Sequence, residues 1–248
     1  MAPSATTVSP RTAALIAGAG YIAIFILAIF ANFYVRTGLI QTDDPAATIQ
    51  NIADSQSLFR LGIVSFLAVF ILDVVIAWAL YVLFRAVNRV VSLLSAWFRL
   101  VYTVMLGVSL VFFFVAAQMV AGGGYLSAVG PDQSAIPVML LLDAFNYAWL
   151  IGLACFGIHL LLMGYLVIVS GAAPKALGIL LGIAGAAYVI DTVANALLSN
   201  YADHASLFLM IVAIPSIVGE LAFTVWLLLR AGKDQAHVDA ERGQLVDA

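Results

Sequence analysis

Charged residues are scarce in this sequence: Asp, Glu, Lys and Arg make up 9% of the 248 residues, whereas 65% are hydrophobic. A soluble domain carries about a quarter charged residues because its surface faces water. A chain with so few charges cannot cover a water-facing surface, so we expect lipid to be its main solvent. The net charge of −3 is small and argues against a nucleic-acid binder, which would need a basic surface.

Cysteine and histidine are also rare, with one Cys and three His. Cys155 lies in an apolar run and is expected to be a small buried hydrophobe. The chain has no His-x-x-x-His or Cys-x-x-Cys pair, which argues against a metal site. It also has no phosphate-binding loop and no Gly-x-Gly-x-x-Gly motif. We therefore predict neither a metal nor a cofactor.

Long apolar segments are what the sequence has in abundance. A helix needs about 20 apolar residues to cross the roughly 30 Å hydrocarbon core of a bilayer. Six segments qualify: Ala13–Val35, Leu58–Phe84, Val90–Val120, Ile136–Ser170, Ala176–Leu198 and Leu207–Leu229. We predict an all-α, six-span bundle over residues 13–230, a polar N-terminal tail over 1–12 and a disordered tail over 231–248. The fourth segment could instead be two short pieces broken near Asn146.

Turn and packing signals separate these segments. Asp44 fits a helix N-cap with Pro45 at the first helical position. The segment 46–57 that follows is expected to form a short amphipathic helix at the membrane interface. In the fifth span, Gly178 and Gly182 form a small-xxx-small pattern that lets another helix approach closely. That contact could lie inside the bundle or between two copies of the chain.

Basic residues predict the orientation. The positive-inside rule places the more basic set of span ends in the cytoplasm. That set contains Arg11, Arg85, Arg89, Lys175, Arg230 and Lys233, whereas the opposite set has Arg36 and Arg60 among several aspartates. We therefore predict a multi-pass protein of the cytoplasmic membrane, such as a bacterial inner membrane, with both termini inside.

Ionisable residues within the spans are the candidates for function. An ionised group at the bilayer centre costs at least about 2.5–3.5 kcal/mol on insertion scales. Five such residues are Asp73, Arg99, His159, Asp191 and Glu220. Four of them, all except Asp191, lie about 14–18 Å from the cytoplasmic ends of their spans, at about 1.5 Å per residue. This depth is close to the bilayer midplane.

Helical spacing predicts that these groups face the protein interior. Polar residues recur every three or four positions on three spans. The stripes are Ser92, Ser95, Arg99 and Tyr102 on the third span, Tyr188, Asp191 and Asn195 on the fifth, and Ser216, Glu220 and Thr224 on the sixth. If Arg99 is positive and His159 neutral, Asp73 and Glu220 together leave one negative charge uncompensated. One carboxyl would then hold a proton, or Arg99 would form a static pair with a carboxylate that ties helices together.

Several short stretches resemble a bacterial membrane-protein family known as domain of unknown function 4386. They are Leu58–Ser65, Val87–Arg89, Phe98–Val101, Tyr125–Ser127, Pro131–Gln133, Gly164–Leu166, Tyr188–Asp191 and Gly219–Thr224. The resemblance covers nearly all of the chain except the two tails. The family often carries an acid directly after the serine that ends the first stretch, where this chain has Phe66, and Asp73 lies two turns further on. The resemblance implies a multi-span bundle and no established activity.

These observations lead to one main hypothesis and three alternatives. The main hypothesis is a polar pocket near the midplane that binds a small or lipid-like molecule. Its candidate ligand-binding residues are Arg99, Asp73, Glu220, His159, Tyr102, Asp191, Asn195 and Asp143. The alternatives are an intramembrane enzyme with Asp73 or Glu220 as general acid, a proton-coupled transporter, and a structural membrane subunit. The lipid bilayer is the expected partner, and a homo-oligomer is possible on this sequence.

Overall fold

Apolar segments of this length fold as helices in lipid, because each backbone N–H and C=O must find a partner within the chain. The computed structural model describes residues 8–122 and 131–231, and in these ranges it contains helices and short connections but no strand. Six helices are long and apolar enough to span a membrane: Pro10–Leu39, Gln56–Phe84, Arg89–Ala121, Ala135–Ser170, Lys175–Leu197 and Tyr201–Leu229. The predicted all-α, six-span fold class is confirmed.

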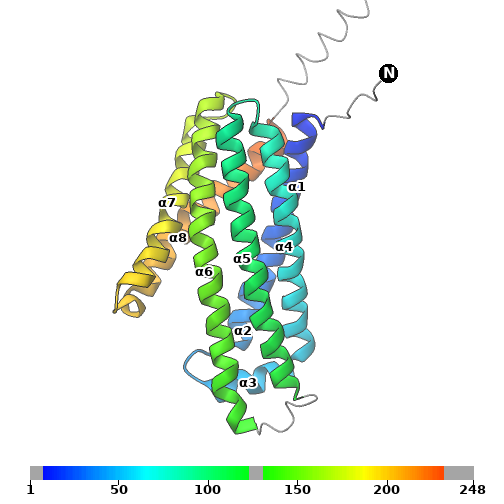
Figure 1. Cartoon of the computed structure of the whole chain (residues 1–248), viewed down its shortest axis with the longest axis vertical. Helices are drawn as coiled ribbons and strands as arrows, with labels where there is room; N and C mark the ends of the chain where they lie inside the picture. The colour runs from blue at the N-terminus through cyan, green and yellow to red at the C-terminus, as the bar shows by residue number, and fades with distance from the viewer. Residues whose placement is uncertain (1–7, 123–130, 232–248) are drawn as a thin grey trace, which may run out of the picture. The chain divides into compact units, whose positions relative to one another are not determined.

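The first span is not one regular helix. It consists of α1 (Pro10–Ile29), a π-helical segment η1 (Phe30–Arg36) and the short α2 (Thr37–Leu39) (Figure 1). The short helix α3 (Pro45–Asp54) follows, and the Asp44 carboxylate accepts a hydrogen bond of 2.9 Å from the Ala47 backbone N–H. This is the N-cap arrangement that the Asp-Pro sequence predicts.

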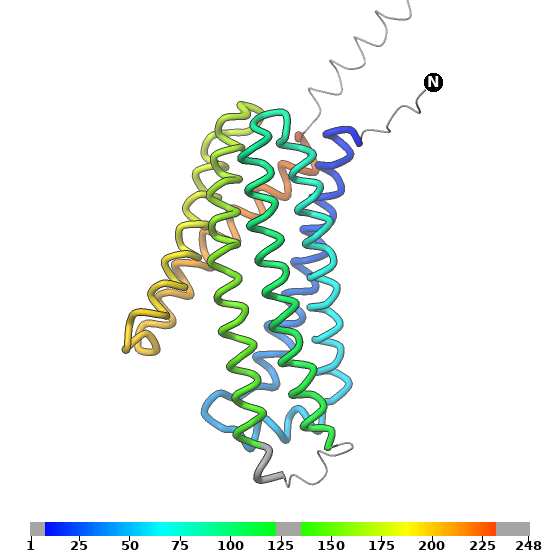
Figure 2. Tube along the Cα trace, in the orientation of Figure 1, coloured from blue at the N-terminus to red at the C-terminus, as the bar shows by residue number. Residues whose placement is uncertain are grey.

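The remaining spans are α4 (Gln56–Phe84), α5 (Arg89–Ala121), α6 (Pro131–Ser170), α7 (Lys175–Leu197) and α8 (Tyr201–Leu229), which Figure 2 follows in chain order. Helix α6 runs unbroken through Asn146, so the fourth predicted segment is one helix rather than two. The predicted disordered tail lies outside the described residues from position 232 onward.

The chain divides into two compact units, and the division passes through several of the long helices. The first unit comprises Met1–Ile22, Val74–Leu100 and Leu153–Ala248, and the second comprises Ala23–Asp73 and Val101–Gly152. The first unit therefore holds α7 and α8 complete, and the second holds η1 and α3 complete.

Glycines bring α6 and α7 into close contact within the first unit. A Cβ atom built on Gly164 would lie 2.5 Å from the carbonyl oxygen of Gly178, and one on Gly157 would lie 2.6 Å from that of Gly185. Two backbones can approach this closely only where side chains are absent. The small-residue pattern of the fifth span is thus used inside the chain.

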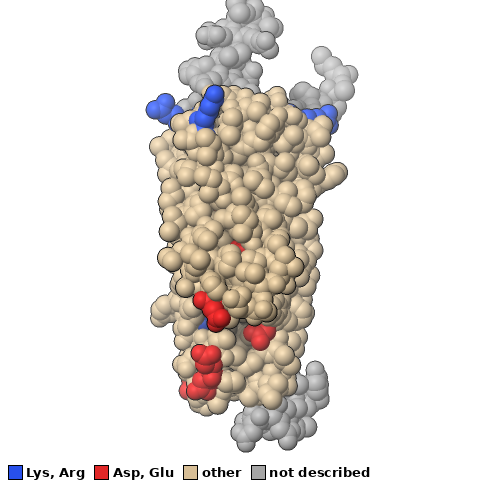
Figure 3. Space-filling view, turned by 90° about the vertical axis from the view of Figure 1, so that its left-hand side faces the viewer, with Lys and Arg blue, Asp and Glu red and all other residues tan. Residues whose placement is uncertain are grey.

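One end of the first unit gathers helix termini and basic residues. The Arg11 guanidinium, at the start of α1, donates hydrogen bonds to the carbonyl oxygens of Leu227 at 3.0 Å and Ala231 at 3.1 Å, and also to that of Leu228. Carbonyls at the end of a helix lack the intrahelical donor that the others have, and here a cation from another helix donates to them. Figure 3 shows basic side chains at the top of the face drawn, the end at which Figure 1 shows the α4–α5 and α6–α7 connections.

Aromatic rings form the core of the second unit. The Phe113 and Phe145 rings stack with centroids 3.7 Å apart, and Phe66 contacts both of them. Phe59 on α4 lies against Phe113 as well, with centroids 5.4 Å apart. These rings join α4, α5 and α6 in a dry contact whose energy comes from dispersion, because lipid is as apolar as the rings themselves.

Candidate functional site

The polar stripe of the third span faces the interior, as the helical spacing predicts. Arg99 is 1% exposed, and Ser92, Ser95 and Tyr102 are buried with it. By size, Arg99 is among the largest fully buried side chains in the described part of the chain. A guanidinium removed from water in this way must be held by hydrogen bonds or charges.

The first unit supplies partners for Arg99 from two other helices. One terminal nitrogen, Nη1, donates a hydrogen bond of 2.7 Å to the Tyr21 hydroxyl on α1. The same nitrogen lies 3.3 Å from Nε2 of His159 on α6. The guanidinium also lies over two ring faces, 4.9 Å from the Tyr21 centroid and 5.4 Å from that of Phe156. Cation–π contacts of this kind are strongest where water is absent.

The hydrogen bonds of His159 identify its tautomer. A guanidinium has only donors, so Nε2 must accept the bond from Arg99 and can carry no proton. Nδ1 then carries the ring proton and donates to the Ser95 carbonyl oxygen at 3.0 Å. The Ser95 hydroxyl oxygen also lies 2.8 Å from Nδ1 and donates to the His159 carbonyl oxygen at 3.3 Å. His159 is therefore a neutral imidazole, because a proton on Nε2 would face another donor.

Helix α8 contributes a second set of buried polar side chains to the first unit. Ser216, Glu220 and Thr224 are 5%, 8% and 3% exposed, so the stripe predicted for the sixth span faces inward. The Thr224 hydroxyl donates a hydrogen bond of 2.7 Å to the Glu220 carbonyl oxygen one turn earlier. One helical turn away, Phe223 meets the Tyr21 ring edge-on with centroids 6.1 Å apart.

The predicted site residues do not all belong to one unit. Arg99, His159, Glu220, Asp191 and Asn195 lie in the first unit. Asp73 and Tyr102 belong to the second unit and are buried, at 1% and 9% exposure, whereas Asp143 of the second unit is exposed.

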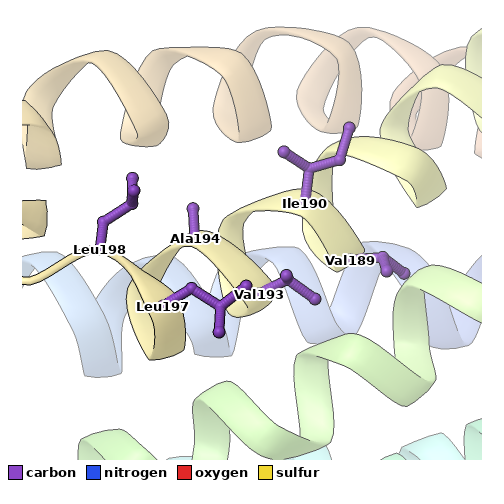
Figure 4. A pocket seen from close by; sticks show the side chains of 6 residues that line it. All are labelled: Val189, Ile190, Val193, Ala194, Leu197 and Leu198. Atoms are coloured by element: carbon purple, nitrogen blue, oxygen red, sulfur yellow. The ribbon is translucent and has the colours of Figure 1, made fainter.

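The C-terminal part of α7 contains one polar pair and an apolar hollow. The Tyr201 hydroxyl donates a hydrogen bond of 2.6 Å to an Asp191 carboxylate oxygen. Next to this pair is a hollow of about 310 Å³. Its lining side chains contain only carbon (Figure 4): Val189, Ile190, Val193, Ala194 and Leu197 come from α7, and Leu198 directly follows the helix. This volume is at the lower end of the range for small-molecule sites.

Aromatic contacts connect Arg99 with Tyr188 on α7. Tyr188, the residue before Val189 of the hollow, meets the Phe156 ring edge-on with centroids 5.5 Å apart. Phe156 in turn lies under the Arg99 guanidinium and beside His159, 5.7 Å between ring centroids. Tyr188, Phe156 and Arg99 therefore form one set of contacting side chains in the first unit, and Tyr188 is the chain neighbour of a residue that lines the hollow.

Sequence analysis missed Tyr21 and Phe156 as members of this cluster. Tyr21 has no polar neighbour three or four residues away in its span, so only its hydroxyl distinguished it. Phe156 lies three residues before His159, on the same helical face, and that spacing was the available signal. Within the described residues, no group of three or more His, Cys, Asp or Glu could hold a metal ion.

These features define a multi-pass α-helical membrane protein with a buried cluster of ionisable side chains. The chain belongs to the family described as Domain of unknown function (DUF4386), which matches residues 16–231. It is similar to an uncharacterized protein from Archaeoglobus fulgidus, with 32% identity over 172 residues that cover 69% of this chain and 85% of the relative. No solved structure matches the chain.

Proposed function

We propose that this protein binds an amphipathic, lipid-like molecule through the Arg99 cluster of its first unit. The observation that carries the proposal is a guanidinium at 1% exposure with a phenol, a neutral imidazole and two ring faces around it. Ionisable residues that face the interior of a membrane bundle are by default sites of function. Arg99 would attract an anionic or hydrogen-bonding headgroup, and Glu220 would exchange a proton with it.

The hollow on α7 supports a ligand with an apolar tail. Its lining is as apolar as a hydrocarbon chain. Tyr188, the residue before Val189 of the lining, contacts Phe156, and Phe156 lies under the Arg99 guanidinium. A molecule lying along this path would place its tail against Val193 and its polar end near the cation. Asp191 and Asn195, which are half-buried on the same helix, would lie near the tail of the molecule.

The test is native mass spectrometry of the purified full chain, which shows the molecules that remain bound. We expect a bound amphipathic species in the wild type and in Arg89→Gln, because Arg89 is exposed at the start of α5. We expect Arg99→Gln to lose that species. Val193→Trp, which fills the hollow and leaves the hydrogen bonds of Arg99 in place, should reduce its occupancy as well.

A structural role is the second candidate, and the same network favours it. The hydrogen bonds of Arg99 and His159 join α1, α5 and α6, so the cluster could serve only to hold these helices together. That role predicts that Arg99→Gln melts at a lower temperature than Arg89→Gln while no variant binds an amphipathic molecule. Equal occupancy of the bound species in Arg99→Gln and Arg89→Gln would contradict the binding proposal.

We also propose that the basic end of the first unit faces the cytoplasm and that the protein lies in the cytoplasmic membrane. The support is the number of basic residues at that end, which include Arg11, Arg85 and Arg230, together with the positive-inside rule.

A further inference from the structure

Arg36 of the second unit does not behave as an arginine at the end of a span usually does. Such residues normally extend their long side chains toward the aqueous interface. Arg36 instead turns back along its own helix and donates a hydrogen bond of 3.3 Å to the Asn32 side-chain oxygen, four residues earlier in the span. Its other terminal nitrogen donates a bond of 2.6 Å to the side-chain oxygen of Asn146 on α6. The guanidinium is thus fixed from two helices.

The surroundings of this guanidinium leave its charge uncompensated. Both bonded oxygens belong to neutral amides. Two aromatic rings lie beside the cation, with centroids 5.9 Å away for Phe145 and 5.7 Å away for Trp149. In the described part of the chain no carboxylate forms an ion pair with Arg36. A half-buried cation next to a membrane, with donors and rings around it, has the character of an anion-binding site.

A second donor, on a ring that the Arg36 guanidinium contacts, lacks an acceptor. The Trp149 indole N–H is buried, and no oxygen or nitrogen atom of the described residues accepts its hydrogen bond. A buried donor without an acceptor costs free energy that a bound acceptor would recover. The Trp149 ring is held in place by Phe66 and Phe145, which meet it edge-on with centroids 5.9 Å and 5.8 Å away.

The local backbone is also unusual. Arg36 ends the π-helical segment η1, which begins at Phe30 and includes Asn32. The single proton of the Thr37 hydroxyl is shared between the carbonyl oxygens of Asn32 at 2.9 Å and Phe33 at 2.8 Å, and the Thr37 backbone N–H also donates to the Asn32 carbonyl oxygen. Short π-helical segments occur frequently at functional sites because they re-aim side chains relative to the rest of the helix.

We propose that Arg36, supported by Asn32 and Asn146 and accompanied by the Trp149 N–H, forms a binding site for a phosphate-bearing anion. The guanidinium fork offers paired donors that match phosphate oxygens. Either a phospholipid headgroup or a dissolved phosphate could supply this chemistry. The site uses no residue of the Arg99 cluster, so it does not depend on the function proposed above.

The experiment measures binding to the full chain in an uncharged detergent by native mass spectrometry. The probes are phosphatidylglycerol, a diacylglycerol with the same acyl chains, and inorganic phosphate as a competitor. We expect the wild type to bind phosphatidylglycerol more tightly than diacylglycerol. Arg36→Gln should weaken phosphatidylglycerol binding roughly tenfold, since it removes the charge from a charge-assisted hydrogen bond. Arg60→Gln is the matched control, because Arg60 is exposed and belongs to the same unit.

Competition identifies the source of the phosphate. Displacement of the lipid by inorganic phosphate would support a site for a dissolved anion, and its failure would support a site for the lipid headgroup. Trp149→Phe keeps a ring and removes the N–H, so it should also weaken binding. If Arg36→Gln does not fold, Asn146→Ala replaces it, because it keeps the charge and removes one support of the guanidinium. The proposal would be overturned if the folded Arg36 or Asn146 variant bound phosphatidylglycerol as tightly as Arg60→Gln does. It would also be overturned if the wild type bound phosphatidylglycerol and diacylglycerol with equal affinity.

Discussion

Three arginines of this chain are each held by a different set of partners. Arg11 satisfies the carbonyl oxygens at the end of α8. Arg99 is fully buried with Tyr21 and His159 around it, and Arg36 is held by two amide oxygens among aromatic rings. A guanidinium suits all three places because its five donors are fixed in one plane and its charge is delocalised. Residue type alone therefore does not distinguish a cap, a core member and a binding site.

At this scale we predict that Arg11 stabilises the first unit through α8. Arg11→Ala should lower the free energy of unfolding by about 1–2 kcal/mol, the value of charge-assisted bonds to helix-end carbonyls in a partly buried place. Thermal unfolding of the purified chain measures this loss. Arg230→Ala is the control, because Arg230 lies exposed at the same end of α8. Equal melting temperatures for the two variants would show that the contacts of Arg11 contribute nothing.

Sequence patterns predicted which residues of the site are buried, but they did not predict which residues contact one another. The spacing of Ser95 and Arg99 indicated an inward face, and both side chains are buried. Arg11 and Arg36 were interpreted only as topology signals, since a basic residue at a span end usually contacts water or headgroups. Arg11 bonds to Leu227 and Arg36 bonds to Asn146, which lie 216 and 110 residues away in the chain, and no local pattern indicates such pairs.

Among the elements, α6 and α7 show how glycine replaces side-chain packing. Gly164 and Gly157 of α6 face Gly178 and Gly185 of α7 at distances that leave no room for a Cβ atom. Sequence reasoning identified the α7 glycines from their spacing but left their partner open, because a small-residue pattern serves contacts within and between chains equally well. The π-helical turn of the first span carried no such signal, since its apolar composition matches that of a regular helix.

We predict that two glycines of α7 differ in their tolerance of alanine. Gly178→Ala should destabilise the protein by about 1–3 kcal/mol, the usual cost of adding atoms to a filled contact. Gly182→Ala should be neutral or slightly stabilising, because a Cβ atom at Gly182 meets nothing within 4 Å and alanine has the higher helix propensity. Denaturation of both purified variants tests the contact. A Gly182→Ala variant as unstable as Gly178→Ala would contradict the assigned partner.

For the whole molecule, composition was sufficient to predict the class of fold. A chain with 65% hydrophobic and 9% charged residues can be folded stably only in lipid, and its six long helices have the length that a bilayer requires. Composition could not reveal that the buried polar groups lie in two separate compact units, since that division depends on contacts between distant segments.

For the whole molecule we predict that the basic end faces the cytoplasm. In a Cys155→Ala background, Asp43→Cys should react with a membrane-impermeant maleimide in intact cells. Ala172→Cys, in the connection between α6 and α7, should react only after the membrane is permeabilised. Both positions are exposed, so a difference in labelling reports sidedness rather than burial. The reverse pattern of labelling would place the basic end outside the cell.

We propose that the buried cation of the first unit and the hollow of α7 belong to one amphipathic binding site. The most direct measurement is a high-resolution density map of the purified full chain in lipid. The account predicts elongated density that lies against Val193 and ends in a polar group near Phe156 and Arg99. A map in which protein side chains fill that path completely, with no molecule beside Arg99, would contradict it and leave the cluster as a structural connection between helices.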